Sequence, residues 1–161
     1  MPAPIIHNAR TSAGFTLVEM LTVLGLFALI AGLGLFISMD AYRSSSFHSE
    51  RDLVIALLEH ARAQAVNNIC TGGSCADGLA HGLEVTNNTY TVFQGSSYAS
   101  RDATQDQIFD ANPTVTLSGD AEVVFAQLTG AVASPKVMTF REGEKVSTTT
   151  VELNGRIWWT H

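Results

Sequence analysis

This protein is built around residues 14–20, which read GFTLVEM and join a short polar leader to a long apolar run. The twenty consecutive residues from Met20 to Met39 carry no charge. A helix needs about 20 apolar residues to cross a hydrocarbon core of about 30 Å. The run therefore predicts a transmembrane helix over residues 15–39, and a buried core helix is the less favoured alternative.

One acidic residue, Glu19, stands where the apolar run begins. An ionisable group at the membrane end of such a helix costs a few kcal/mol unless it finds a partner, so its position predicts a function. Gly14, Phe15 and Glu19 resemble the type IV prepilin leader motif, in which cleavage after a glycine leaves an N-terminal phenylalanine. The resemblance implies that a prepilin peptidase cuts between Gly14 and Phe15 and methylates the Phe15 amine. It also implies that Glu19 neutralises the N-terminal ammonium of a neighbouring subunit during assembly.

Two other interpretations of the N-terminus stay open. A secretory signal would place a small-residue cleavage site after the apolar segment, and Ser38 with Ala41 offers a weak site of that kind. An uncut signal anchor of an unrelated domain would instead keep Met1. The leader motif favours the prepilin interpretation over both.

The charges make no polyanion an obvious partner, although folding can still bring basic residues together into a local patch. Nine basic and fifteen acidic residues give a net charge of −6. Proteins that grip DNA through phosphates usually cluster their basic residues, whereas those of this chain are scattered from Arg43 to Arg156. The leader is expected to be cytoplasmic, because Arg10 lies on that side of the apolar run and the motif agrees.

The chain is expected to divide into four segments. These are a leader peptide over 1–14, a transmembrane or filament-core helix over 15–39, an amphipathic helix over 40–69 and a β-rich head over 70–161. Length allows one domain outside the membrane with a core of its own. The expected fold class is α+β, with a long N-terminal helix packed on an antiparallel sheet domain as in pilins.

An amphipathic pattern supports continuation of the helix to about Asn68, with an irregularity near Ser44-Ser45-Ser46. The apolar stripe comprises Leu53, Val54, Leu57, Leu58, Ala61, Ala65 and Ile69, and the polar face comprises Arg51, Asp52, Glu59 and Arg62. The pair Ala61-Arg62 resembles the helix end of minor pilins of the GspH/FimT type, and Gly155-Arg156-Ile157 resembles their closing strand.

Cys70 and Cys75 enclose four flexible residues and would be expected to form a disulfide outside the cytoplasm. A zinc site is the less favoured alternative, since only His60 and His81 lie near and four ligands are needed.

After Asp77-Gly78 the pattern changes to period two, which predicts antiparallel strands. Expected strands are Leu79–Thr86 and Thr89–Gln94 around Asn87-Asn88, two more around Gly119-Asp120, then 137–140, 146–153 and 156–159. Residues 95–113 are expected to form a long polar interaction loop. Trp158 and Trp159 should point to opposite faces, with one of them in the core and the other at an edge or contact.

Motifs for catalysis are missing from the sequence: it has no HExxH, no Gly-x-Ser-x-Gly and no phosphate-binding loop. We therefore expect a non-enzymatic minor pilin or pseudopilin of a type II secretion pseudopilus or a type IV pilus. No cofactor is expected. Expected partners are other pilin subunits, the prepilin peptidase and the bacterial inner membrane, with the head in the periplasm. The alternative is a DNA-binding minor pilin of a competence pilus, with Arg156, Trp158 and Trp159 as contacts.

Overall fold

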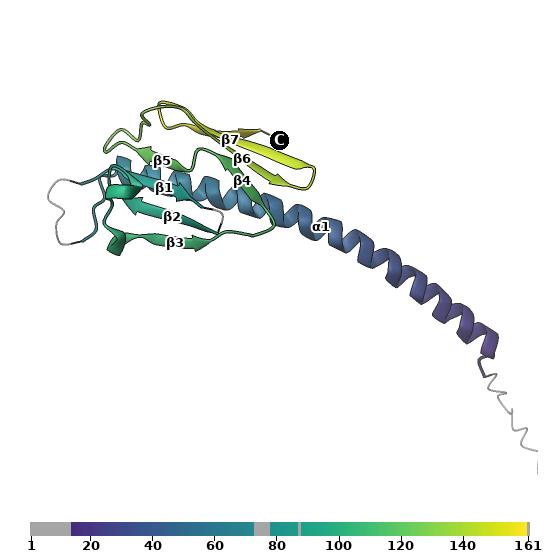
Figure 1. The fold of residues 1–161 in the computed structure, drawn as a ribbon. Coiled ribbons are helices and arrows are strands. Elements are labelled where there is room, and N and C mark those ends of the chain that lie inside the picture. Colours follow the sequence, from purple (N-terminus) through teal and green to yellow (C-terminus); the bar gives the residue numbers. More distant parts are fainter. Residues whose placement is uncertain (1–13, 73–77, 87, 161) are drawn as a thin grey trace, which may run out of the picture. The chain divides into compact units, whose positions relative to one another are not determined.

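The computed structural model describes residues 14–72, 78–86 and 88–160, without the side chains of residues 34–43. It divides into two compact units, Met1–Tyr42 and Arg43–His161. Among its described residues the first unit contains residues 14–16, which carry no regular secondary structure, and the first part of a helix; the second unit contains the rest of that helix and two sheets (Figure 1). The expected α+β class, with a helix followed by antiparallel strands, is confirmed.

Helix α1 spans Leu17–Val66. It stays helical through Ser44, Ser45 and Ser46, where the sequence predicted an irregularity. The Ser46 hydroxyl accepts a hydrogen bond from Asn112 Nδ2 at 2.5 Å. Because this serine bonds to a distant loop, it does not compete for the helix backbone.

The helix ends two residues before the predicted position, in a turn built on Asn68. Asn68 has φ of 54°, a left-handed conformation that asparagine tolerates better than most residues. Its N–H donates to the Ala65 carbonyl at 3.2 Å, and the Ile69 N–H donates to the Gln64 carbonyl at 2.9 Å. This pair of bonds is a Schellman motif. The turn directs Ile69 away from the helix face, so the prediction that Ile69 belongs to the buried stripe is wrong.

The described strands form two antiparallel four-stranded sheets. Sheet A has the order β3-β2-β1-β5, with β1 at His81–Val85, β2 at Thr89–Gln94, β3 at Gln107–Asp110 and β5 at Glu122–Phe125. Sheet B has the order β4-β6-β7-β8, with β4 at Thr116–Gly119, β6 at Lys136–Glu142, β7 at Lys145–Val151 and β8 at Ile157–Thr160. Two short 3-10 helices, Tyr98–Ser100 and Ala103–Gln105, lie between β2 and β3.

The strands on the two sides of Gly119-Asp120 belong to different sheets. β4 pairs with β6, and β5 pairs with β1. The Asp120 N–H donates to the Val137 carbonyl at 2.9 Å, and the Val137 N–H donates to Asp120 Oδ2 at 2.8 Å. The turn is thus fastened to β6, and the chain crosses from sheet B to sheet A there.

The predicted loop over residues 95–113 is only partly a loop, and that prediction is corrected. It contains both 3-10 helices and strand β3, which pairs with β2. β3 is an edge strand in which only Phe109 is partly buried. Its side chains therefore lack the alternation by which a strand is recognised in a sequence.

The core of the second unit joins the helix to both sheets. Val54, Leu58, Ala61 and Ala65 are fully buried, as the stripe predicted. They share one cluster with Leu83, Val92, Val123 and Phe125 of sheet A and with Met138, Phe140 and Val151 of sheet B. The amphipathic part of α1 is thus an element of the domain core.

Two neighbouring helix residues, Glu50 and Arg51, are buried although charged. Glu50 Oε1 accepts hydrogen bonds from the Tyr90 hydroxyl at 2.6 Å and from the Asn112 N–H at 2.8 Å. Arg51 was predicted to lie on the polar face, but it is only 7% exposed. Its guanidinium pairs with Asp52 at 2.7 Å and lies 5.8 Å from the centre of the Trp159 ring. Glu50 therefore binds the helix to sheet A, and Arg51 contacts sheet B.

Candidate functional site

The N-terminus of α1 is capped by Thr16. The Glu19 N–H donates to Thr16 Oγ1 at 3.2 Å, and the Met20 N–H donates to the Thr16 carbonyl at 3.2 Å. Thr16 and Glu19 thus occupy the N-cap and N3 positions, and the hydrogen bond to the Thr16 hydroxyl is the N-cap half of the Thr-x-x-Glu capping pattern. The prediction from sequence considered only the charge of Glu19. The pattern Thr-x-x-Glu at residues 16–19 would also have predicted Thr16 as the N-cap.

The peptide bond between Gly14 and Phe15 lies just before this cap. Residues 14–16 carry no regular secondary structure, and Gly14 and Phe15 are exposed. A Cβ added to Gly14 would meet nothing within 4 Å. A processing enzyme needs an accessible, non-helical peptide, and the described residues present one at the predicted cleavage position.

Glu19 lies in the first turn of α1 and is exposed. A carboxylate there is stabilised by the partial positive charge of the helix N-terminus. Its predicted partner, the Phe15 amine of another subunit, can exist only after cleavage. The proposed assembly role of Glu19 therefore stays a prediction.

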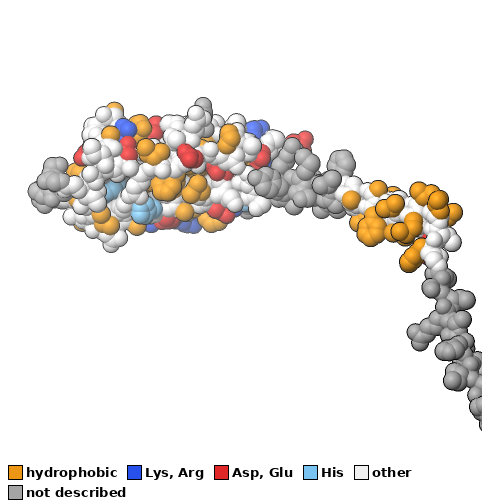
Figure 2. Space-filling model, turned by 90° about the horizontal axis from the view of Figure 1, so that it is seen from below, with side chains coloured by type: hydrophobic (Ala, Val, Ile, Leu, Met, Phe, Trp, Pro, Cys, Tyr) orange, Lys and Arg blue, Asp and Glu red, His pale blue; other side chains and the backbone are white. Residues whose placement is uncertain are grey.

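The surface of α1 over residues 17–33 is mostly apolar, and its large apolar side chains are exposed; Figure 2 shows one face of it. Its exposed large apolar residues are Leu17, Val18, Met20, Leu21, Val23, Leu24, Leu26, Phe27, Leu29, Ile30 and Leu33. Within the described residues, no helical stretch is both long enough and apolar enough to cross a bilayer. The side chains of residues 34–39, the last part of the predicted span, lie outside the description.

The predicted contact residues of the C-terminal strand lie at an edge of sheet B. β8 pairs only with β7, and Arg156, just before it, is exposed. Trp158 is 37% exposed and Trp159 is 46% exposed, so the prediction that one of them lies in the core is wrong. The reason is topological, since none of the strands in the described residues pairs with the outer edge of β8. Trp159 lies opposite the buried Thr149 and contacts Arg51, whereas Trp158 lies on the other face.

The two regions that resembled GspH/FimT minor pilins meet in the structure. Gly155 has φ of 78°, and a Cβ added there would overlap the Gly130 carbonyl oxygen and lie 2.9 Å from Arg62 Nε. Gly130 has φ of 64° and lies against Arg62 and Val66. The helix end and the turn before β8 thus approach so closely that glycine is required.

Of the two cysteines predicted to form a disulfide, the structure describes Cys70 only. Cys70 follows the helix, and its neighbour Thr71 donates its N–H to Gln94 Oε1 at 2.8 Å. Cys75 lies outside the described residues, so the pairing stays a prediction.

The histidines named for the zinc alternative have other contacts. His60 Nε2 lies 3.3 Å from Gln107 Oε1, and the buried His81 has Nδ1 3.1 Å from the Leu79 carbonyl. Burial lowers the pKa of His81 below its ordinary value, although the hydrogen bond to Leu79 opposes this. Among the described residues, no three potential ligands gather into a metal site.

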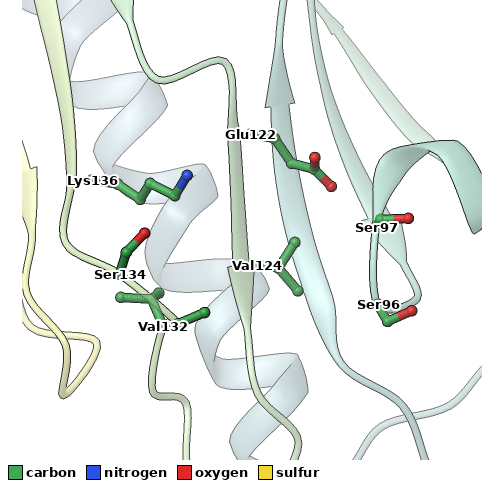
Figure 3. Close-up of a pocket in the computed structure, with 8 residues that line it drawn as sticks. Ser96, Ser97, Glu122, Val124, Val132, Ser134 and Lys136 are labelled. Carbon is green, nitrogen blue, oxygen red and sulfur yellow. The ribbon is translucent and has the colours of Figure 1, made fainter.

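A pocket of about 210 Å³ lies between β5 and the segment that leads into β6 (Figure 3). Glu122 and Lys136 flank it from opposite sides, with Ser96, Ser97 and Ser134 around its rim. Lys136 Nζ already pairs with Asp120 at 3.2 Å, and Glu122 Oε1 accepts from the Tyr98 N–H at 2.6 Å. Both charged groups are thus engaged in the structure of the domain.

Comparison with known proteins points to the N-terminal segment. Residues 9–35 match the prokaryotic N-terminal methylation motif. Searches of curated proteins and of solved structures found no significant match. The match covers Gly14, Phe15, Glu19 and the exposed apolar surface behind them, and the fold is the helix and antiparallel sheets expected of a pilin. The chain therefore carries, in residues 9–35, the N-terminal segment of a type IV prepilin-like protein.

Proposed function

We propose that this chain is a minor pilin or pseudopilin, a structural subunit of a type II secretion pseudopilus or a type IV pilus. The methylation motif at residues 9–35 carries the proposal. It is supported by the exposed peptide at Gly14-Phe15 and by the uncovered apolar helix surface behind it. The close approach of Arg62 to Gly155 supports assignment to the GspH/FimT type.

The proposed mechanism is assembly without catalysis. A prepilin peptidase cleaves after Gly14 and methylates the Phe15 amine. The apolar surfaces of neighbouring helices then cover one another, and the Glu19 carboxylate of one subunit meets the Phe15 ammonium of the next. The Glu19 carboxylate and the Phe15 ammonium each lack a partner when a subunit is alone in the membrane. Their pairing therefore favours ordered assembly over dispersed subunits.

The proposed location follows from the same segment. The precursor is a single-pass protein of the bacterial inner membrane, with residues 1–14 in the cytoplasm and the head in the periplasm, and the mature chain enters a filament. Periplasmic oxidation would join Cys70 to Cys75 and close the loop that follows the helix. The closed loop is short, so its entropic stabilisation is about 2 kcal/mol.

The experiment that tests this function is mass spectrometry of the protein recovered from membranes with and without the prepilin peptidase. The proposal requires an N-methylated Phe15 that depends on the peptidase. An intact Met1 in both samples, or cleavage near Ala41, would contradict it.

A second candidate function is DNA binding by a minor pilin of a competence pilus. The exposed Arg156 next to the exposed Trp158 favours it, because an indole can stack on a base while a guanidinium contacts phosphate. The net charge of −6 opposes it. Titration with a labelled single-stranded oligonucleotide across salt concentrations would decide, since phosphate contacts predict affinity that falls steeply with salt. Absence of binding at low salt would exclude this candidate.

A further inference from the structure

Strand β5 lies at an edge of sheet A, and one side of its main chain has no strand partner in the described part of the chain. The Val85 N–H donates to the Ala121 carbonyl at 2.7 Å, so the main chain of Ala121 faces β1. In an antiparallel pair, the N–H and C=O groups of alternate residues face the partner strand. Val123 therefore also faces β1, whereas Glu122 and Val124 direct their main-chain groups to the free side.

The chain that follows β5 closes only one end of this free side. The Ala126 N–H donates to the Ala131 carbonyl at 2.7 Å, and the Ala126 carbonyl accepts from the Gly130 N–H at 2.8 Å. The next N–H, that of Val132, donates to the Leu153 carbonyl at 3.0 Å. The segment that leads into β6 thus separates from β5 directly after the turn.

Neither Glu122 nor Val124 has a main-chain hydrogen bond on the free side to any described residue. Two hollows follow one another there. The larger, of about 370 Å³, is bordered by Val124 and Ala126. The smaller, of about 210 Å³, is bordered by Val124 and Glu122 (Figure 3). Sheet edges that bind an extended peptide have this arrangement, in which main-chain hydrogen bonds provide affinity and successive hollows accept alternate side chains.

The smaller hollow is bordered by a pair of carboxylates. Glu122 lies directly opposite Glu84 of β1. Burial and the charge of Glu122 raise the pKa of Glu84 above its ordinary value, although Arg101 opposes this. Arg101 itself pairs with Asp106 at 2.8 Å. The Tyr98 N–H donates to Glu122 Oε1 at 2.6 Å, which fixes this carboxylate without neutralising it. A cation in the hollow would relieve the repulsion between the two carboxylates.

We infer that β5 binds an extended segment of a different protein, which carries an apolar residue and, two positions later, a basic residue. The segment runs antiparallel to β5, as the paired strands of both described sheets do. The apolar residue lies opposite Val124 in the larger hollow, and the basic residue lies opposite Glu122. Both residues exchange main-chain hydrogen bonds with β5. One segment fills the site, so the contact does not propagate and is compatible with a minor subunit.

The described strands of this chain do not supply such a segment. None of them carries an apolar residue followed two positions later by a basic one. A second copy of the chain therefore lacks the pattern that the site fits. The site belongs to the head and does not involve the N-terminal segment, so the inference stands or fails separately from the proposed function.

Fluorescence anisotropy of a labelled peptide, Thr-Val-Thr-Lys-Thr, tests the site with the full chain in detergent micelles. N-methylation of the valine and the lysine removes the two N–H groups that bond to β5 and should weaken binding at least about tenfold. N-methylation of the middle threonine, whose N–H faces away from β5, should change the affinity less than about twofold. Equal effects of the two modifications, or no saturable binding of the unmodified peptide, would overturn the inference.

A bulky side chain in the groove supplies a variant of the protein. Ala133 borders both hollows and is exposed, so Ala133→Trp should fill the groove and weaken peptide binding at least about tenfold. Ala103→Trp makes the same change at an exposed position outside both hollows and should leave the affinity unchanged. Unchanged affinity in Ala133→Trp would place the peptide elsewhere and refute the assigned site.

A charge exchange tests the basic residue. Glu122→Gln keeps an acceptor for the Tyr98 N–H but removes the charge, so it should weaken binding of the lysine peptide about threefold. The same variant should bind a peptide with glutamine in place of lysine as well as the unmodified chain does. Equal losses for both peptides would show that charge does not select the occupant.

Sedimentation equilibrium of the full chain without peptide tests the identity of the partner. The inference requires that the groove of the chain alone stays unoccupied at every concentration. A dimer that the peptide dissociates, and that Ala133→Trp does not form, would make the occupant a second copy and overturn the assignment to a different protein.

Discussion

At the scale of single residues, Glu19 combines two roles that the structure allows one to separate. Its backbone N–H is bonded to Thr16 Oγ1, which caps the helix, whereas its carboxylate is exposed and free to meet a neighbouring subunit. Capping affects the stability of the first turn within one chain. Charge pairing affects only assembly between chains.

Glu19→Ala and Glu19→Gln should both leave membrane association intact and reduce incorporation into filaments severalfold, because each removes the charge. Thr16→Ala costs about 1 kcal/mol of helix capping but keeps that charge, so its incorporation should stay near that of the unmodified chain. Quantitative immunoblotting of sheared filaments against membranes measures the ratio. Normal incorporation of Glu19→Gln would show that charge is not the reason for this residue.

Glu50 is expected to contribute to stability through two buried hydrogen bonds. Glu50→Ala leaves the buried Tyr90 hydroxyl and the Asn112 N–H without their acceptor. An unsatisfied buried donor costs about 1–3 kcal/mol, so the free energy of unfolding should fall by about 2–4 kcal/mol. Glu59→Ala, at an exposed position of the same helix, should change it by less than about 0.5 kcal/mol. Urea titrations followed by tryptophan fluorescence would compare the two, and equal effects would contradict the assigned role of Glu50.

At the scale of elements, the turn before β8 is tightly constrained, because Gly155 lies against the backbone of Gly130. Gly143, in the turn between β6 and β7, has no such contact and serves as the control. Gly155→Ala would place a methyl group on the Gly130 carbonyl at a positive φ. Gly143→Ala also has a positive φ, 60°, but meets open space. The first substitution should cost more than about 3 kcal/mol and the second about 1 kcal/mol. Thermal unfolding of the two variants tests this, and similar melting temperatures would mean that the turn can move.

At the scale of the whole molecule, stability should depend on pH through the buried His81. Burial lowers its pKa in the folded state, so below about pH 6.5 the unfolded chain binds more protons than the folded chain. The free energy of unfolding should therefore fall as pH decreases from 7 toward 5. The slope contributed by one proton does not exceed about 1.4 kcal/mol per pH unit.

His81→Gln should flatten this pH dependence even if it lowers stability at pH 7. Denaturant titrations at several pH values measure the slope. An unchanged slope in His81→Gln would assign the pH dependence to other groups.

Local features of this protein followed from its sequence. The α+β class, the leader motif, strand β2 and the fully buried positions Val54, Leu58, Ala61 and Ala65 depend on residues that are neighbours along the chain or recur at a helix or strand period. Such local patterns can be recognised in the sequence because they do not depend on contacts between distant segments.

Only the tertiary structure decided which distant segments meet. β4 and β5 flank one turn yet join different sheets, Arg51 is buried against Trp159, and β8 is an edge strand that leaves both tryptophans exposed. The polar strand β3 likewise became recognisable only through its pairing with β2. Each of these features depends on the order of strands in a sheet, and that order is set by packing between residues far apart in the sequence, where no local periodicity records it.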